Sequence, residues 1–289
     1  DLFKGKELGS ANVAQVVGYK IGMLVGGGIL LRASASIGWR GMLFAIAAMI
    51  ATVIGSVLLL REPLQQGRVA QVRQHLSDVV VTLGKQLRSP SGMWLLLFIG
   101  TYKIGETLVD ALYTPFLIDM GYKPSQIGGW IGIWGMVAST LGSLCGGILA
   151  GRLPMLWAVA LTSVLRVVAM GGECYLTFLT PPQPVDIIVV SICEHFAGGA
   201  LTTAMFAFMM LRVDAAIGAS HYTVLASIEV LGKLPTGLVA GYVATKLGYQ
   251  KTFFLGTALS ALFLLLLVPL RLAPPPIERA SDDASPPAS

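Results

Sequence analysis

IGWRGMLF, residues 37–44, returns in altered form as LGYQKTFF, residues 247–254. The glycine, the aromatic residue after it and the final phenylalanine all match. At the same offset, the preceding apolar segments share two more glycines, Gly22 with Gly232 and Gly27 with Gly237. A repeat that spans more than one apolar segment indicates two structural units of the same kind within one protein.

The composition around this repeat is that of an integral membrane protein. Of 289 residues, 55% are hydrophobic and 12% are charged, and the mean hydropathy is +0.75. An ordinary soluble domain carries about 25% charged residues. The net charge of +5 is spread over short loops rather than gathered in a stripe, which favours membrane orientation over nucleic-acid binding.

Apolar windows of about 20 residues, the length that crosses a bilayer, predict eight helices. They lie at 11–32, 40–61, 92–119, 126–151, 154–180, 185–211, 221–246 and 251–271. The repeat pairs the first two windows with the last two. We therefore expect an all-α polytopic membrane protein with eight of twelve transmembrane helices in this chain, the N-terminal four being absent.

This count predicts four regions. Residues 1–61 hold the last two helices of an N-terminal six-helix bundle, 62–91 a central loop, 92–272 a C-terminal six-helix bundle, and 273–289 a disordered tail rich in Pro and Ser. A cytoplasmic central loop places most loop Lys and Arg on the cytoplasmic side. Apolar residues at helical spacing between Val69 and Leu87 predict an interfacial amphipathic helix there, and a solvated linker is the alternative.

TYKIGETLVDAL, residues 101–112, places Lys103, Glu106 and Asp110 inside an apolar window. Each charge at the bilayer centre costs about 2.5–3.5 kcal/mol, so intramembrane charges are expected to face protein or water. At 100° per residue these three share one helix face. Further charges near the middles of other windows are Lys20, Arg166, Glu194, Glu229 and Lys233. Together they predict a polar path through the protein.

Local pairing is the competing explanation for some of these charges. Glu229 and Lys233 are four residues apart and can neutralise each other, as can Lys103 and Glu106. Asp110 and Glu194 have no such partner on their own helix, and a half-paired buried carboxylate can carry a proton. We therefore predict Asp110 and Glu194 as the proton-coupling residues.

Three further residues lie close to this path. His195 follows Glu194 but points about 100° away from it, which favours a packed or hydrogen-bonded core histidine over a proton relay. Arg166 and Glu173 are seven residues apart and share a helix face, which we expect to turn inward against neighbouring helices rather than toward lipid or the main cavity. Arg166 is expected to meet a carboxylate from another helix.

Glycine and proline predict where helices touch or break. Small-residue spacing at Gly142, Gly146, Gly147 and Gly151, and at Gly237 and Gly241, predicts close helix contacts. Pro115 and Pro235 follow charged residues and indicate either interrupted helices or simple kinks. Gly26–Gly28 lack the pattern of a phosphate loop and favour packing or bending.

GILAGRL, residues 147–153, resembles the loop motif of the major facilitator superfamily between the second and third helices of a half. GYKIGM (18–23), YKIGE (102–106) and EHFAGG (194–199) resemble the branch that contains bacterial muropeptide permeases and the acetyl-coenzyme A transporter. The resemblance extends from residue 1 to about 270. It implies two halves that rock around a midplane site, a bulky and often anionic cargo, and proton drive.

The predicted function is that of a secondary transporter working by alternating access, proton-coupled, for an organic anion or bulky polar solute that is acetyl-coenzyme A-like or amino-sugar/peptide-like. The expected substrate-binding residues are Tyr19, Lys20, Tyr102, Lys103, Glu106, Glu229 and Lys233. A transporter-shaped receptor or scaffold that moves nothing is the alternative.

No catalytic, metal or cofactor motif is present, and Cys145, Cys174 and Cys193 are interpreted as small buried hydrophobic residues. The expected partners are the substrate, protons and the lipid bilayer, without nucleic acid, and the protein is expected to be a monomer.

Overall fold

A computed structural model of the chain describes residues 18–22, 25, 30–59, 81, 84, 88–213 and 218–272. Its regular secondary structure in these residues is helical throughout, which confirms the all-α prediction. Five helical segments there are long and apolar enough to cross a membrane: Ile37–Leu59, Gly128–Arg152, Met155–Leu176, Pro184–Leu211 and His221–Leu270. The predictions for residues 11–17, Gly26–Gly28, most of the central-loop helix and the tail lie outside the described residues.

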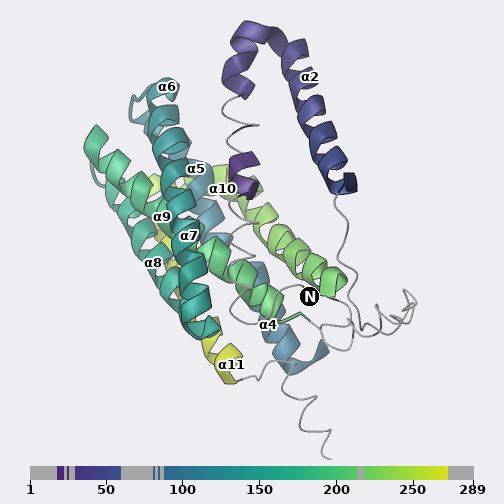
Figure 1. The fold of residues 1–289 in the computed structure, drawn as a ribbon. Helices are drawn as coiled ribbons and strands as arrows, with labels where there is room; N and C mark the ends of the chain where they lie inside the picture. Colours follow the sequence, from purple (N-terminus) through teal and green to yellow (C-terminus); the bar gives the residue numbers. More distant parts are fainter. Residues whose placement is uncertain are drawn as a thin grey trace, which may run out of the picture.

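Most of the described helices form one bundle (Figure 1). Its members are α4 (Pro90–Thr101), α5 (Ile104–Asp119), α6 (Pro124–Ile127), the π-helix η2 (Gly128–Gly135), α7 (Met136–Arg152), α8 (Met155–Leu176), α9 (Pro184–Leu211), α10 (Gly218–Phe263), the 3-10 helix η3 (Leu264–Leu266) and α11 (Leu267–Leu272). Helix α9 packs mainly against α7 and α8, and α10 against α5 and α4. Helix α2 (Leu30–Leu59) stands beside this bundle.

The predicted window 92–119 forms two helices rather than one. Helix α4 begins where the Ser89 hydroxyl accepts a hydrogen bond from the Gly92 amide over 3.0 Å, and it ends at Thr101. Helix α5 starts at Ile104, so Tyr102 and Lys103 form a turn between the two helices. The chain stays helical through Pro115 and Pro235. The predicted interruptions at Pro115 and Pro235 are therefore wrong, and the interruption at Tyr102 and Lys103 was not predicted.

Two glycines of the internal repeat adopt the same unusual backbone conformation. Gly38 has φ 70° and ψ 169°, and Gly248 has φ 78° and ψ 164°. Each lies where two helical segments meet at a kink, within α2 and α10 respectively. A positive φ with an extended ψ is accessible almost only to glycine. The repeat seen in the sequence is thus also a repeat of chain geometry.

Two apolar clusters hold the bundle together on either side of a charged layer. On α8, Arg166 lies between Val159 of one cluster and Met170 of the other. On α9, Glu194 lies between Ile187 and Leu201 in the same way. Lys103, Glu106, Arg166, Glu194, Glu229 and Lys233 lie between the clusters in this way, and Asp110 and Glu173 lie alongside members of one cluster. We call these eight residues the charged layer. Burial of the two clusters thus fixes the depth of the charges.

Glycines allow α7 and α9 to touch backbone to backbone. A Cβ atom on Gly142 would lie 1.9 Å from the Phe196 carbonyl oxygen, and one on Gly146 would lie 2.3 Å from that of Ala200. These contacts confirm the predicted seam. On α10, a Cβ atom on Gly237 would make an ordinary contact with Thr107, and one on Gly241 would meet no described atom within 4 Å, so the seam predicted there stays a prediction.

Candidate functional site

Arg166 is the centre of an ion-pair network that joins three helices. From α8, its Nε lies 3.4 Å from Glu106 Oε2 and its Nη2 lies 3.1 Å from Asp110 Oδ1, both on α5. Its Nη1 contacts the Glu194 carboxylate on α9 and donates to the Glu194 carbonyl oxygen over 2.9 Å. Arg166 is only 2% exposed. The prediction that it meets a carboxylate from another helix is confirmed.

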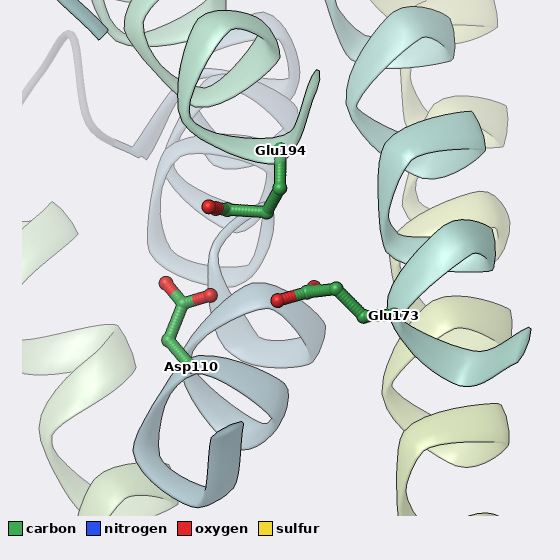
Figure 2. Close-up of side chains that lie close together, drawn as sticks. All are labelled: Asp110, Glu173 and Glu194. Carbon is green, nitrogen blue, oxygen red and sulfur yellow. The ribbon is translucent and has the colours of Figure 1, made fainter. Parts of the chain in front are cut away.

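Glu173 lies two helical turns after Arg166 and faces the same network. The carboxylates of Asp110, Glu173 and Glu194 each have an oxygen within 4.8 Å of the other two. Figure 2 shows these side chains converging from three helices. Glu173 is 1% exposed, and its Oε2 accepts no hydrogen bond from any described residue. Its inward orientation matches the prediction.

His195 is hydrogen-bonded, as predicted, but it contacts Glu194 instead of pointing away from it. Its Nδ1 contacts the Glu194 carboxylate and lies 3.0 Å from the Ser191 carbonyl oxygen one turn earlier. The helical angle between neighbouring residues describes where their Cβ atoms point, whereas two long side chains can still fold towards each other. We refer to Glu106, Asp110, Arg166, Glu173, Glu194 and His195 as the Arg166 cluster.

A second network, the Glu229 cluster, consists of Lys103, Glu229 and Lys233. The ammonium groups of Lys103 and Lys233 lie 3.2 Å and 3.1 Å from the same Glu229 oxygen. The predicted Glu229–Lys233 pair is present. The alternative pairing of Lys103 with Glu106 is wrong, because Lys103 reaches across to α10 while Glu106 turns to Arg166.

A small cavity borders the Arg166 cluster. It has a volume of about 20 Å³, and its lining includes Tyr102, Glu106, Arg166 and Ser260. The Tyr102 hydroxyl, the Ser260 hydroxyl and Arg166 Nε are buried and have no hydrogen-bond partner among the described residues. This volume is sufficient for one water molecule, which needs two to four polar partners. The predicted residues Tyr102 and Glu106 thus border a polar space.

Lys20 and Tyr19 lie outside both clusters. Lys20 is 8% exposed, and its Nζ donates to the Ser139 carbonyl oxygen on α7 over 2.9 Å and also contacts the Ser139 hydroxyl. Tyr19 is 61% exposed, and its role in substrate binding stays a prediction.

The two clusters carry opposite excess charge. The Arg166 cluster sets four carboxylates against one guanidinium and one imidazole. The Glu229 cluster sets two ammonium groups against one carboxylate. One end of the charged layer is therefore suited to hold protons or a cation, and the other to attract an anion. The sequence indicated the charges, but it assigned Arg166 and Glu173 no part in the site.

Comparison with known proteins identifies the architecture that carries this layer. Residues 1–222 match the family model of the Major Facilitator Superfamily. The chain belongs to the major facilitator superfamily. Within this superfamily, the anhydromuropeptide permease of Escherichia coli (strain K12) is 30% identical over 273 residues, which cover 93% of this chain and 55% of the permease. The putative transporter AmpG 4 of Rickettsia conorii is 24% identical over 277 residues, which cover 92% of this chain and 66% of that transporter.

Membership of the major facilitator superfamily confirms the superfamily resemblance found in the motifs, whereas the branch with the acetyl-coenzyme A transporter stays a prediction. Together with the long apolar helices, it indicates a multi-pass integral membrane protein of a transporter family, not an enzyme. The chain spans about half the length of the Escherichia coli permease that it matches. The predicted totals of eight and twelve helices stay predictions.

Proposed function

We propose that the protein is a proton-coupled secondary transporter for an anionic, bulky polar solute of the amino-sugar or peptide type. The observation that carries this proposal is the charged layer, in which an acid-rich and a lysine-rich cluster lie between two apolar clusters. Buried charges are costly, and in membrane proteins they mark substrate and ion pathways. A scaffold that moves nothing has no need of such a layer.

The Glu229 cluster is the proposed contact for the anionic part of the cargo. Lys103 and Lys233 share one carboxylate, so one positive charge remains without a full counterion. A carboxylate or phosphate of the cargo can supply the missing counterion. The Lys233 side chain is 32% exposed, which leaves it accessible to a solute. Tyr102, whose ring centroid lies 5.7 Å from Lys103 Nζ, holds this lysine from the other side.

The Arg166 cluster is the proposed site of proton coupling, with Asp110 and Glu194 as the residues that the sequence indicates. The Asp110 side chain is 45% exposed and can exchange protons with water in a cavity. The cargo class is supported by the similarity to the anhydromuropeptide permease. An acetyl-coenzyme A-like cargo shares the anionic chemistry and is the alternative.

Uptake into proteoliposomes tests this function. Full-length protein with an imposed pH gradient should accumulate an anhydromuropeptide, and acetyl-coenzyme A, amino sugars and short peptides are assayed alongside it. Lys103→Gln and Lys233→Gln should each raise the cargo concentration needed for half-maximal uptake. Lys251→Gln, which changes an exposed lysine outside the charged layer, is the control. Folded protein that accumulates none of these solutes favours the scaffold.

A further inference from the structure

Glu173 is the unmatched member of the Arg166 cluster. The guanidinium of Arg166 is already paired with Glu106, Asp110 and Glu194, and His195 contacts Glu194. Among the described residues, no ion pair reaches the Glu173 carboxylate, although Glu173 is the most deeply buried of the four acids. An ionised carboxylate that is buried without a counterion or a hydrogen bond is strongly disfavoured, whereas a neutral carboxyl is not.

The groups that face Glu173 come from every helix packed around it. Helix α5 contributes Glu106, Asp110 and the Tyr113 hydroxyl, α8 contributes Arg166, and α9 contributes Glu194, which His195 contacts in turn. Helix α10 approaches α8 nearby through the Thr257 hydroxyl, which lies 3.4 Å from the Met170 carbonyl oxygen. Acidic groups therefore outnumber basic groups around Glu173, and no second guanidinium or ammonium in the cluster can offset its charge.

We propose that Glu173 holds the coupling proton of this transporter as a neutral carboxyl next to Asp110 and Glu194. The inference rests on the proposed function and deepens it, because it assigns the proton to a residue beyond the two that the sequence indicated. Asp110 and Glu194 each offer an acceptor oxygen within 4.8 Å of a Glu173 oxygen (Figure 2).

A proton fits this position better than a metal ion. Asp110 and Glu194, which would have to coordinate a metal together with Glu173, already contact the guanidinium of Arg166. A metal ion among the three carboxylates would lie against that positive charge. A proton needs only one donor oxygen and one acceptor oxygen, and it leaves both arginine pairs in place.

Asp110 provides the route between Glu173 and water. Its side chain is 45% exposed, whereas the whole of Glu173 is only 1% exposed. In the transfer, the O–H bond on Glu173 breaks and an O–H bond on Asp110 forms, with no change in oxidation state. Asp110 then releases the proton to water at its exposed carboxylate. Loss of the proton leaves Glu173 charged, so Arg166 must give up another carboxylate to pair with it, and this exchange of partners links proton release to helix movement.

Infrared spectroscopy tests the site without any cargo. Full-length protein in lipid nanodiscs should show at neutral pH the C=O stretching band of a protonated carboxyl, and an alkaline jump should remove it. The band should vanish in Glu173→Gln and persist in Asp110→Asn. Asp186→Asn, which changes a capping residue at the start of α9, is the control. Persistence of the band in Glu173→Gln overturns the assignment, as does its loss on adding sodium at constant pH, which indicates a metal site.

Transport assays provide a second test of the role of Glu173. Glu173→Gln mimics the neutral carboxyl, so we expect it to fold and to lose accumulation driven by a pH gradient, while exchange of labelled cargo stays measurable. Accumulation as in the wild type would overturn the proposal. If the infrared band behaves as expected and no solute is moved, the protonated Glu173 is supported and the proposed function fails. The two failures are therefore distinguishable.

Discussion

Lys20 donates a hydrogen bond to the carbonyl oxygen of Ser139 over 2.9 Å. The same carbonyl accepts the Ser143 hydroxyl over 2.9 Å, and it would lie 2.1 Å from a Cβ atom on Gly199. Lys20 thus binds at the seam where α7 and α9 meet. Because the sequence assigns Lys20 to the N-terminal bundle and Ser139 to the C-terminal one, we expect this bond to break whenever the two bundles separate.

Replacing Lys20 with Gln should shift the balance between the inward-open and outward-open states. Hydrogen bonds to charged groups contribute about 1.5–3 kcal/mol, which corresponds to roughly a tenfold or larger change in the equilibrium. Pulsed electron paramagnetic resonance between spin labels on the two bundles measures the populations, with Lys251→Gln as the control. Unchanged distance distributions would show that the bond does not hold the bundles together.

Removing the charge of Arg166 should destabilise the protein strongly. Arg166→Met leaves the carboxylates of Glu106, Asp110 and Glu194 without their counterion, and breaking a buried pair in this way costs about 3–5 kcal/mol. Adding Glu194→Gln should recover part of the loss, since it removes one unpaired charge. The apparent melting temperature in detergent reports both effects. A single variant as stable as the wild type would mean that the network carries little stability.

The Glu229 cluster predicts that neutralising Glu229 lowers the stability of the protein more than neutralising Lys233 does. Glu229→Gln leaves Lys103 and Lys233 facing each other without a counterion and should cost about 3–5 kcal/mol. Lys233→Gln leaves the Lys103–Glu229 pair intact, and because Lys233 is partly exposed the loss should stay below about 1 kcal/mol. The charge swap of Glu229→Lys with Lys233→Glu should not restore stability, since it places an ammonium group against Lys103. Rescue by the swap would contradict the shared carboxylate.

The α7–α9 seam predicts a matched pair of glycine variants. Gly142→Ala forces a Cβ atom against the Phe196 carbonyl oxygen and should destabilise the bundle by about 1–3 kcal/mol. Gly241→Ala meets nothing within 4 Å and should leave the melting temperature unchanged or raise it. Equal effects at both positions would show that helix propensity, rather than the close approach, determines the outcome.

The parts of the fold that depend on local chemistry were predictable from the sequence. The gaps between the predicted windows 11–32 and 40–61, and between 221–246 and 251–271, contain Gly38 and Gly248, where the two kinks lie. The positive φ at both positions favours glycine. The charges of the layer were equally visible, since Arg166 or Glu194 is conspicuous within an apolar window.

The pairing of those charges was not predictable. Lys103 and Glu106 have helical spacing, but Lys103 lies in the turn before α5, where helical spacing does not determine side-chain direction. Arg166 could be assigned a carboxylate partner but not three, because the sequence does not say which faces of α5 and α9 meet α8. Such pairings depend on helix rotation, which is set by packing far from the charges.

The turn at Tyr102 and Lys103 has one more electrostatic effect. It exposes the amino end of α5 near the middle of the predicted span 92–119, where an uninterrupted helix has no end at all. The aligned peptide dipoles of a helix place about half a positive elementary charge at that end, and the carboxyl end of α4 places a similar negative charge on the other side of the turn. Glu106 in the first turn offsets part of the positive charge. Since backbone amides do not titrate, this contribution to the potential around the Glu229 cluster stays constant across a pH gradient, whatever protons the neighbouring side chains gain or lose.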